Sequence, residues 1–166
     1  MKIENSTKKA PFEVFQQTIK YFPTVSINII LRNDEKEFLF VKRKNNPAKG
    51  LFWTPGGRIL NGETMKIAAQ RILKEETGLR GSIHYLSPVY LEEIFDTSDF
   101  DAEDQKIYLP EIKTIHYLST AILMELEKTE EIKLDFQSVA YKWQKELPHQ
   151  DPYLRAYFDL VKDYLQ

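Results

Sequence analysis

The sequence predicts an α+β protein folded as a three-layer α/β/α sandwich. Apolar residues recur at helical spacing near both ends of the chain and once in its middle, and runs of β-branched and aromatic residues of strand length lie between them. Helices and strands in this mixed order favour layered packing. With 166 residues, the chain is expected to form a single domain spanning residues 1–166.

The individual elements follow from these patterns. An N-terminal helix is expected over residues 11–22, where four large apolar residues share one face and a proline follows. A C-terminal helix is expected over residues 152–165, because Asp151 and Pro152 form a favoured helix start. Strands are expected at residues 24–31, 37–42, 83–95, 114–126 and 139–143.

Composition excludes several classes of function. The net charge of −2 offers no broad basic surface for nucleic acid polymers. The chain has no cysteine, which excludes disulfides, thiolate metal sites and cysteine nucleophiles. The first residues are polar and no apolar run reaches membrane-spanning length, so we expect no membrane contact and a cytoplasmic location.

The most informative segment is residues 57–79, in which a glycine-led loop runs into a helix. Its fixed positions are Gly57, Glu63, Arg71, Glu75, Glu76, Gly78 and Leu79. Glycines let the loop backbone approach a ligand closely, and Arg71 lies one helical turn before Glu75 and can pair with it. Positions 72, 75 and 76 are expected on one side of the helix. Mg²⁺ needs only one or two protein carboxylates besides waters and phosphates, so we expect Mg²⁺ here, with Mn²⁺ as the second choice.

This spacing resembles the Nudix box, the signature of hydrolases that act on a nucleoside diphosphate linked to another group. One position differs, because Ile72 stands where the box normally carries a glutamate. The resemblance implies a mixed β-sheet between helices and a metal-dependent hydrolase.

The likeness extends beyond the box to one subgroup, the GDP-mannose mannosyl hydrolases. It is carried by residues 25–30, 38–43, 45–50, 52–58 and 154–158, and it covers nearly the whole chain. In that subgroup water attacks the anomeric carbon of the sugar, and the nucleoside diphosphate leaves. Relatives are commonly dimers, so the resemblance also implies a homodimer, with the aromatic-rich N-terminal helix as a candidate interface.

Matched position by position, the resemblance implies roles for individual residues. The metal ligands would be Gly56 through its carbonyl, Glu76 and Gln137, with Glu75 as a further ligand. The substrate-binding residues would be Asn28, Arg43, Arg58 and Tyr117. The catalytic residues would be Arg58, Glu75 and Tyr117, with Tyr117 assisting the leaving diphosphate. Arginine suits the diphosphate because its planar donors pair with phosphate oxygens.

Two departures bear on the mechanism. Asn28 replaces an aspartate that helps to stabilise the cationic sugar, and Ser138 replaces the histidine that serves as general base. A serine hydroxyl is not a base near neutral pH. Glu75 could instead orient water beside the metal. His149 is a second candidate base, although a solvated role is the better interpretation of a lone loop histidine.

Residues 96–112 form a long acidic segment that includes Phe100 and Tyr108. Loops of this length in small domains are usually functional or mobile. Two interpretations are equally supported, a solvated acidic loop and a recognition loop whose carboxylates accept hydrogen bonds from a sugar or a base while Phe100 or Tyr108 stacks on the base.

Three functions fit the sequence. The first is a magnesium-dependent hydrolase of a nucleoside-diphosphate sugar, of the GDP-mannose or GDP-glucose type, that releases GDP and sugar. The second is a pyrophosphohydrolase that cleaves a nucleotide sugar or nucleoside triphosphate at phosphorus. The third is a nucleotide-sugar binder without turnover, which the residues at positions 28, 72 and 138 favour.

Overall fold

The computed structural model describes residues 9–128 and 130–165, and its centre is an eight-stranded mixed sheet. Strands β1 (Thr24–Arg32) and β7 (Thr114–Leu126) run parallel in the middle. Their register places Thr24 opposite Tyr117 and Ser26 opposite Ser119. Residues that lie opposite one another in a sheet point to the same face, so this register decides which side chains meet.

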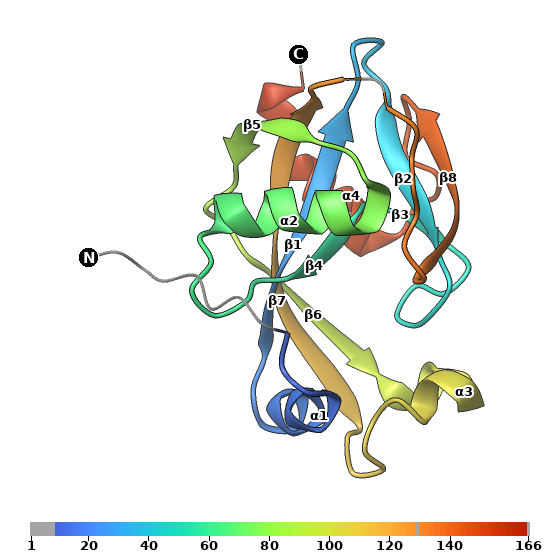
Figure 1. Ribbon diagram of the computed structural model, residues 1–166. Helices are drawn as coiled ribbons and strands as arrows, with labels where there is room; N and C mark the ends of the chain where they lie inside the picture. The colour runs from blue at the N-terminus through green and yellow to red at the C-terminus, as the bar shows by residue number, and fades with distance from the viewer. Residues whose placement is uncertain (1–8, 129, 166) are drawn as a thin grey trace.

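The remaining strands extend the sheet from these two. On the β1 side lie β2 (Phe38–Arg43), β3 (Phe52–Trp53), β4 (Gly56–Arg58) and β8 (Ser138–Gln144). On the β7 side, β5 (Gly81–Leu86) and β6 (Leu91–Asp96) both pair antiparallel with β7. Strand β7 is long enough to serve β5 along one half and β6 along the other, so the β6–β7 pair projects beyond the rest of the sheet (Figure 1).

Helices cover both faces of the sheet (Figure 1). Helix α2 (Met65–Thr77) crosses one face, and α4 (Pro152–Asp159) lies on the other, followed by a 3₁₀ turn, η2 (Lys162–Tyr164). Helix α1 (Phe12–Tyr21), the 3₁₀ turn η1 (Thr97–Asp99) and the short α3 (Ala102–Gln105) gather around the projecting β6–β7 pair. This arrangement confirms the predicted α+β fold with a mixed sheet between helices.

Two hydrophobic cores result from this layering. The core under α2 contains Ile27, Ile29, Leu31, Ile72, Leu73 and Ile122, among others. The core under α4 contains Ile30, Phe40, Leu123, Leu154, Tyr157 and Val161, among others. Successive residues of β1 alternate between the two cores, as the period of a strand requires.

The helix ends follow local sequence rules. Thr64 caps α2 by accepting a hydrogen bond from the Ile67 amide at 3.3 Å, and Gly78 ends that helix with φ of +75°. Asp151 caps α4 through the amides of Tyr153 and Leu154, with Pro152 in the first turn. Among residues 9–128 and 130–165, no helix combines the length and apolar character needed to cross a bilayer.

Some predicted boundaries were wrong. The run at residues 83–95 forms two strands, β5 and β6, because Ser87 and Pro88 interrupt it and both strands pair with β7. The C-terminal helix predicted over residues 152–165 ends at Asp159 as an α-helix. The N-terminal helix occupies Phe12–Tyr21, close to the predicted residues 11–22.

Candidate functional site

The loop that leads into α2 is held by a buried ion pair. Arg71 donates to the two carboxylate oxygens of Glu63 at 2.5 and 2.8 Å, and the Glu63 side chain is 1% exposed. One Glu63 oxygen also accepts from the Leu60 amide, and Arg71 donates to the carbonyl of Arg58 at 2.9 Å. The Arg71 hydrogen bonds hold the pKa of the Glu63 carboxyl below its usual range. The pair therefore fixes the loop that carries Arg58.

Glu75, by contrast, lies on the outside of α2. Arg71 reaches it at 3.3 Å, as the helical spacing predicted, and Lys9 lies 3.0 Å away, but the Glu75 side chain is exposed. The closer partner of Arg71 is Glu63, which the spacing argument overlooked because the loop must fold back for the two to meet.

Glu76 points into the molecule. Its carboxylate accepts a hydrogen bond from the Gly56 amide at 3.1 Å, and no lysine or arginine side chain of the described residues lies within 4 Å of it. Desolvation raises the pKa of the Glu76 carboxyl to about 8, and the neighbouring charge of Asp135 contributes to the rise. A carboxylate held without a counter-charge is a typical metal ligand.

Asp135 and Gln137 lie beside Glu76. The Asp135 amide donates to the Glu76 carbonyl at 3.2 Å, and the Asp135 carboxylate accepts from the amide and the side chain of Gln137 at 3.0 and 3.1 Å. Asp135 was missed in the sequence analysis. The sequence signal that could have indicated Asp135 is its position, an acidic residue two places before Gln137.

These residues suit a divalent cation of the magnesium type. Glu76 and Asp135 offer carboxylate oxygens, and the Gly56 carbonyl and the Gln137 amide offer neutral oxygens, the donors that Mg²⁺ prefers. A cation would also relieve the repulsion between the two carboxylates, which contributes to the raised pKa of Glu76. Within the part of the chain that the structure describes, no group of three or more His, Asp or Glu gathers at one point. A metal here would therefore depend on few protein charges and on substrate phosphates.

Ile72 lies one helical turn before Glu76 and, like Glu76, faces the glycine loop, whereas Glu75 is exposed. The Ile72 side chain is 2% exposed and belongs to the core under α2. A Cβ atom on Gly57 would lie 3.3 Å from Ile72 Cγ1, so the side chain fills the space under the glycine loop. The position has a packing role in this chain.

Arg43 and Arg58 both lie near enough to Tyr117 for their charges to act on its hydroxyl. Burial raises the pKa of the Tyr117 hydroxyl, and the charges of Arg43 and Arg58 offset part of that rise. Arg43 donates to the Pro47 carbonyl at 2.7 Å, and the Arg58 guanidinium lies 3.8 Å from the ring centroid of Phe15 in α1. Two guanidinium groups around a tyrosine form a cationic surface suited to a diphosphate.

Asn28 occupies the floor of the same face. Its amide oxygen accepts from Trp53 Nε1 at 3.2 Å and from Thr54 Oγ1 at 3.3 Å. A Cβ on Gly56 would lie 2.9 Å from the Ile27 carbonyl and 3.0 Å from the Asn28 oxygen, so only glycine fits at position 56. Asn28 is therefore fixed next to the backbone of the candidate metal site.

Among the described residues, none of the three histidines has a hydrogen bond or ion pair with Glu76, Asp135 or Gln137. His149 Nε2 lies 2.8 Å from the Phe52 carbonyl, and its Nδ1 accepts from the Asp151 amide at 3.3 Å, so both ring nitrogens are engaged. The ring also stacks on Trp53. His116 lies 3.0 Å from Glu92, and His84 is exposed on β5. The solvated role expected for His149 was wrong, because the residue ties the loop before α4 to β3.

The acidic segment 96–112 is folded and only partly solvated. Asp104 is buried and accepts from the amide and the side chain of Asn46, each at 3.0 Å, and Asp101 forms an ion pair with Lys49. Phe100 is buried, which leaves Tyr108 as the aromatic residue of the recognition-loop interpretation. Tyr108 lies against the candidate site, where the charges of Arg43 and Arg58 affect its pKa, which burial raises.

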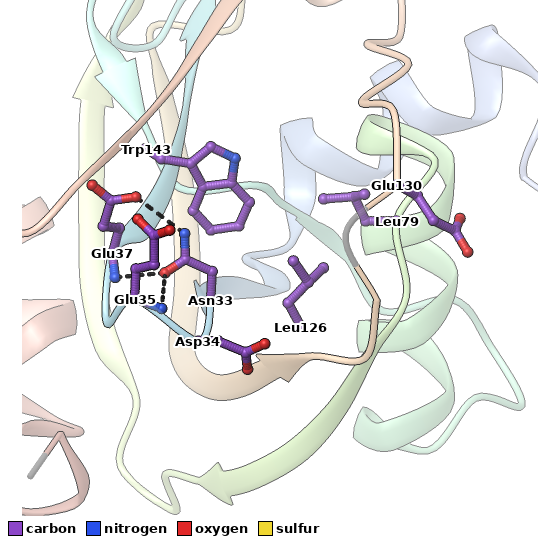
Figure 2. A pocket seen from close by; sticks show the side chains of 8 residues that line it. All are labelled: Asn33, Asp34, Glu35, Glu37, Leu79, Leu126, Glu130 and Trp143. Atoms are coloured by element: carbon purple, nitrogen blue, oxygen red, sulfur yellow. Dashed lines mark hydrogen bonds between the residues drawn. The ribbon is translucent and has the colours of Figure 1, made fainter.

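A separate pocket of about 300 Å³ lies at the other end of β1 (Figure 2). It is lined by Asn33, Asp34, Glu35, Glu37, Leu79, Leu126, Glu130 and Trp143. Its carboxylates would repel a diphosphate, and none of the predicted site residues lines it.

Comparisons with known proteins agree with this geometry. The NUDIX domain family model matches residues 22–156. The chain is 29% identical over 160 residues to the low-salt glycan biosynthesis protein Agl8 of Haloferax volcanii, covering 95% of this chain and 94% of that protein. It is 47% identical over 68 residues to an ADP-ribose pyrophosphatase of Methanocaldococcus jannaschii, covering 41% of this chain and 40% of that protein.

Among solved structures, a MutT protein from Methanosarcina mazei aligns over 88% of this chain and 99% of its own, with a TM-score of 0.60 and 17% identity. At that identity the likeness concerns the fold. Together with the family match over most of the chain, the box loop and the layered fold lead to one conclusion: this chain belongs to the NUDIX domain family and is a Nudix hydrolase.

Proposed function

We propose that this Nudix hydrolase acts on a nucleoside-diphosphate sugar of the GDP-mannose or GDP-glucose type and releases the nucleoside diphosphate and the free sugar. The observation that carries the proposal is the placement of Arg43 and Arg58 around Tyr117, on the sheet face that also carries Asn28. The relative Agl8 is named for glycan biosynthesis, which supports a substrate that contains a sugar.

Each residue has a distinct part in this proposal. Arg43 and Arg58 bind the diphosphate, and the Tyr117 hydroxyl donates a hydrogen bond to the leaving oxygen. Gly56, Glu76 and Gln137, with Asp135 added from the structure, hold Mg²⁺ or Mn²⁺. The resemblance makes Glu75 a further ligand, a role that requires it to leave its exposed ion pairs with Arg71 and Lys9. When bound, the metal neutralises charge on the departing diphosphate.

Replacing Tyr117 with Phe tests its role. The variant keeps the ring that packs against Phe95 and loses only the hydroxyl. We expect kcat to fall about tenfold or more while the melting temperature changes little, since a positioned proton donor contributes on the order of 10²-fold. An unchanged kcat would remove Tyr117 from the leaving-group role.

The second candidate is hydrolysis at phosphorus. It is favoured by the presence of Glu75, by the absence of a histidine base at position 138 and by the likeness to an ADP-ribose pyrophosphatase over 68 residues. The third candidate is a nucleotide-sugar binder, which would hydrolyse its ligand neither at carbon nor at phosphorus.

Product identification separates these functions. The protein is incubated with Mg²⁺ and a panel of GDP-, UDP- and ADP-sugars and nucleoside triphosphates in ¹⁸O-water, and products are read by mass spectrometry. Labelled free sugar with unlabelled nucleoside diphosphate supports the proposal. Labelled monophosphate or sugar phosphate indicates attack at phosphorus, and tight binding without product, under varied Mg²⁺ and Mn²⁺, indicates a binder.

We also propose a homodimer. Phe12, Tyr21 and Phe22 in and after α1 are large and exposed, and burial of this surface against a second copy would shield it from water. Light scattering would show a mass of about twice the chain mass.

A further inference from the structure

Helix α1 brings an aromatic ring to one of the two arginines of the candidate site. Phe15 lies with its ring against the Arg58 guanidinium, and Arg58 Cζ is 3.8 Å from the ring centroid. Planar guanidinium groups stack on aromatic faces, and the attraction is stronger when the pair is partly withdrawn from water. The Arg58 side chain is half-buried, and burial lowers its pKa. The ring therefore contacts a charge that has lost part of its hydration.

The Arg58 guanidinium has no hydrogen-bond acceptor among residues 9–128 and 130–165. Arg32, Arg43 and Arg71, the other arginines of these residues that are not exposed, each donate to at least one carbonyl or carboxylate oxygen. Stacking occupies the face of a guanidinium and leaves the N–H donors in its plane available. Arg58 is thus held by its face while its donors await an acceptor, which suits an anionic ligand.

The main chain at Arg58 is fixed independently of the ring. Arg58 lies opposite Ser26 in the antiparallel pair of β4 and β1, and its carbonyl accepts from Arg71 at 2.9 Å. These contacts fix the point from which the Arg58 side chain starts. They do not fix its long stem, so the guanidinium depends on the stacking contact for its position.

Helix α1 is itself anchored. The Gln16 side chain donates to the Ile107 carbonyl at 2.7 Å, and Lys20 forms an ion pair with Glu111 at 2.7 Å. Ile107 and Glu111 belong to the acidic segment, which gathers with α1 around the projecting β6–β7 pair (Figure 1). The ring of Phe15 is therefore presented to Arg58 by a helix that is tied to its surroundings on the same side.

We infer that Phe15 is a positioning residue for Arg58, whose ring holds the guanidinium with its N–H donors free for the diphosphate of the substrate. An arginine that is ordered in advance loses less conformational freedom when a phosphate binds, so binding is tighter. This inference rests on the proposed function in one respect, the binding of the diphosphate by Arg58. It gives α1 a role in substrate binding that is separate from its proposed part in a homodimer.

The test is a double-mutant cycle, measured by calorimetric titration with inorganic pyrophosphate in EDTA, which prevents metal-dependent turnover. Wild type, Phe15→Leu, Arg58→Gln and the double variant form the cycle. Phe15→Leu keeps an apolar side chain and removes the aromatic face, and Phe15→Tyr restores that face. Phe22→Leu is the matched control, because it removes a ring that directly follows α1 and is 66% exposed.

We expect Arg58→Gln to lower the pyrophosphate affinity about tenfold or more, because charge-assisted hydrogen bonds are lost. Phe15→Leu should lower it about fivefold, and Phe15→Tyr should stay within about twofold of wild type. In the Arg58→Gln background, Phe15→Leu should change the affinity by less than about twofold, because the ring has no guanidinium left to position. A merely structural role for Phe15 would lower the affinity equally in both backgrounds. Phe22→Leu should match wild type.

Three results would overturn the inference. They are unchanged affinity in Phe15→Leu, an equal effect of Phe15→Leu in both backgrounds, and an equal loss in Phe15→Leu and Phe15→Tyr. Unchanged affinity in Arg58→Gln, or a wild type that binds no pyrophosphate, would overturn it together with the proposed role of Arg58.

The ¹⁸O experiment reports on the reaction separately. Labelled monophosphate together with coupling between Phe15 and Arg58 would refute the release of free sugar and keep Phe15 as the positioning residue. Labelled free sugar without that coupling would keep the proposed reaction and refute the role of Phe15.

Discussion

Arg71 and Glu63 are eight residues apart in the sequence, and they face each other across the loop that opens α2, with both Glu63 oxygens bound. The contact is nearly closed to solvent, because the Glu63 side chain is 1% exposed. Two fixed positions of the box spacing therefore hold the loop at the start of α2 in place. Removing one partner leaves the other charge buried and unpaired, which costs more stability than the loss of a surface ion pair.

We therefore predict that Glu63→Gln lowers the free energy of unfolding by about 3 kcal/mol. Glu75→Gln, which removes the exposed partner of the same arginine, should cost less than about 1 kcal/mol. Urea denaturation of both variants at neutral pH measures the difference. Equal losses of unfolding free energy would show that the Glu63–Arg71 pair stabilises the fold no more than the exposed Glu75–Arg71 pair.

The same pair predicts a pH dependence. Arg71 depresses the pKa of Glu63 in the folded state relative to its ordinary value of 4.5. A depressed folded pKa stabilises the fold above the unfolded pKa, and that contribution is lost as the pH falls through the folded value. Wild type should thus lose more stability than Glu63→Gln below about pH 4.5. Melting curves from pH 6 to about pH 3 would show parallel slopes if the pair were absent.

Introducing at position 72 the glutamate that the Nudix box normally carries should not produce an additional metal ligand. Ile72 is 2% exposed and packs under Gly57, so Ile72→Glu places a carboxylate in the core under α2. We expect destabilisation of more than about 3 kcal/mol and no gain in metal affinity. Ile72→Val, the control for packing alone, should cost about 1 kcal/mol. A stable Ile72→Glu protein with tighter Mn²⁺ binding would show that a carboxylate at position 72 can reach the metal.

Metal binding is predicted to depend on Glu76 and Asp135 together. Glu76→Gln and Asp135→Asn should each weaken Mn²⁺ affinity about tenfold or more, because each removes one of few available carboxylates. Glu92→Gln removes an exposed carboxylate of β6 and serves as the control for a change in net charge. Titration followed by electron paramagnetic resonance reports free Mn²⁺ directly. Wild-type affinity in Asp135→Asn would exclude Asp135 from the site.

His149 is predicted to act in folding only. Since both ring nitrogens bond to the main chain and the ring stacks on Trp53, His149→Ala should lower the melting temperature by several degrees. The pH dependence of kcat should keep its shape, because both ring nitrogens are engaged with the main chain and not with the substrate. A lost ascending limb in the pH profile would instead identify His149 as the base.

The sequence predicts the fold well because its signals are local. The run from Thr114 to Leu126 is one strand with both boundaries as expected, and Asp151 and Pro152 begin α4. The split between β5 and β6 was missed because both halves have strand composition, and only their shared partner β7 separates them.

The candidate site was only partly accessible to the same reasoning. Glu76 and the Gly56 segment carry motif spacing, and a hydrogen bond joins them. Gln137, which only the resemblance implied, donates to Asp135. Asp135 carries no motif, and its placement beside Glu76 depends on a contact between segments far apart in the sequence.

The contacts of the acidic segment have a consequence for engineering. Asp104 holds Asn46, and Asp101 holds Lys49, in the same turn that binds Arg43 through Pro47. An exchange of residues 96–112 with those of another Nudix protein would therefore also release the turn that orients Arg43. A chimera designed to change substrate choice should transplant residues 44–50 with the acidic segment, because the two segments form one recombination unit.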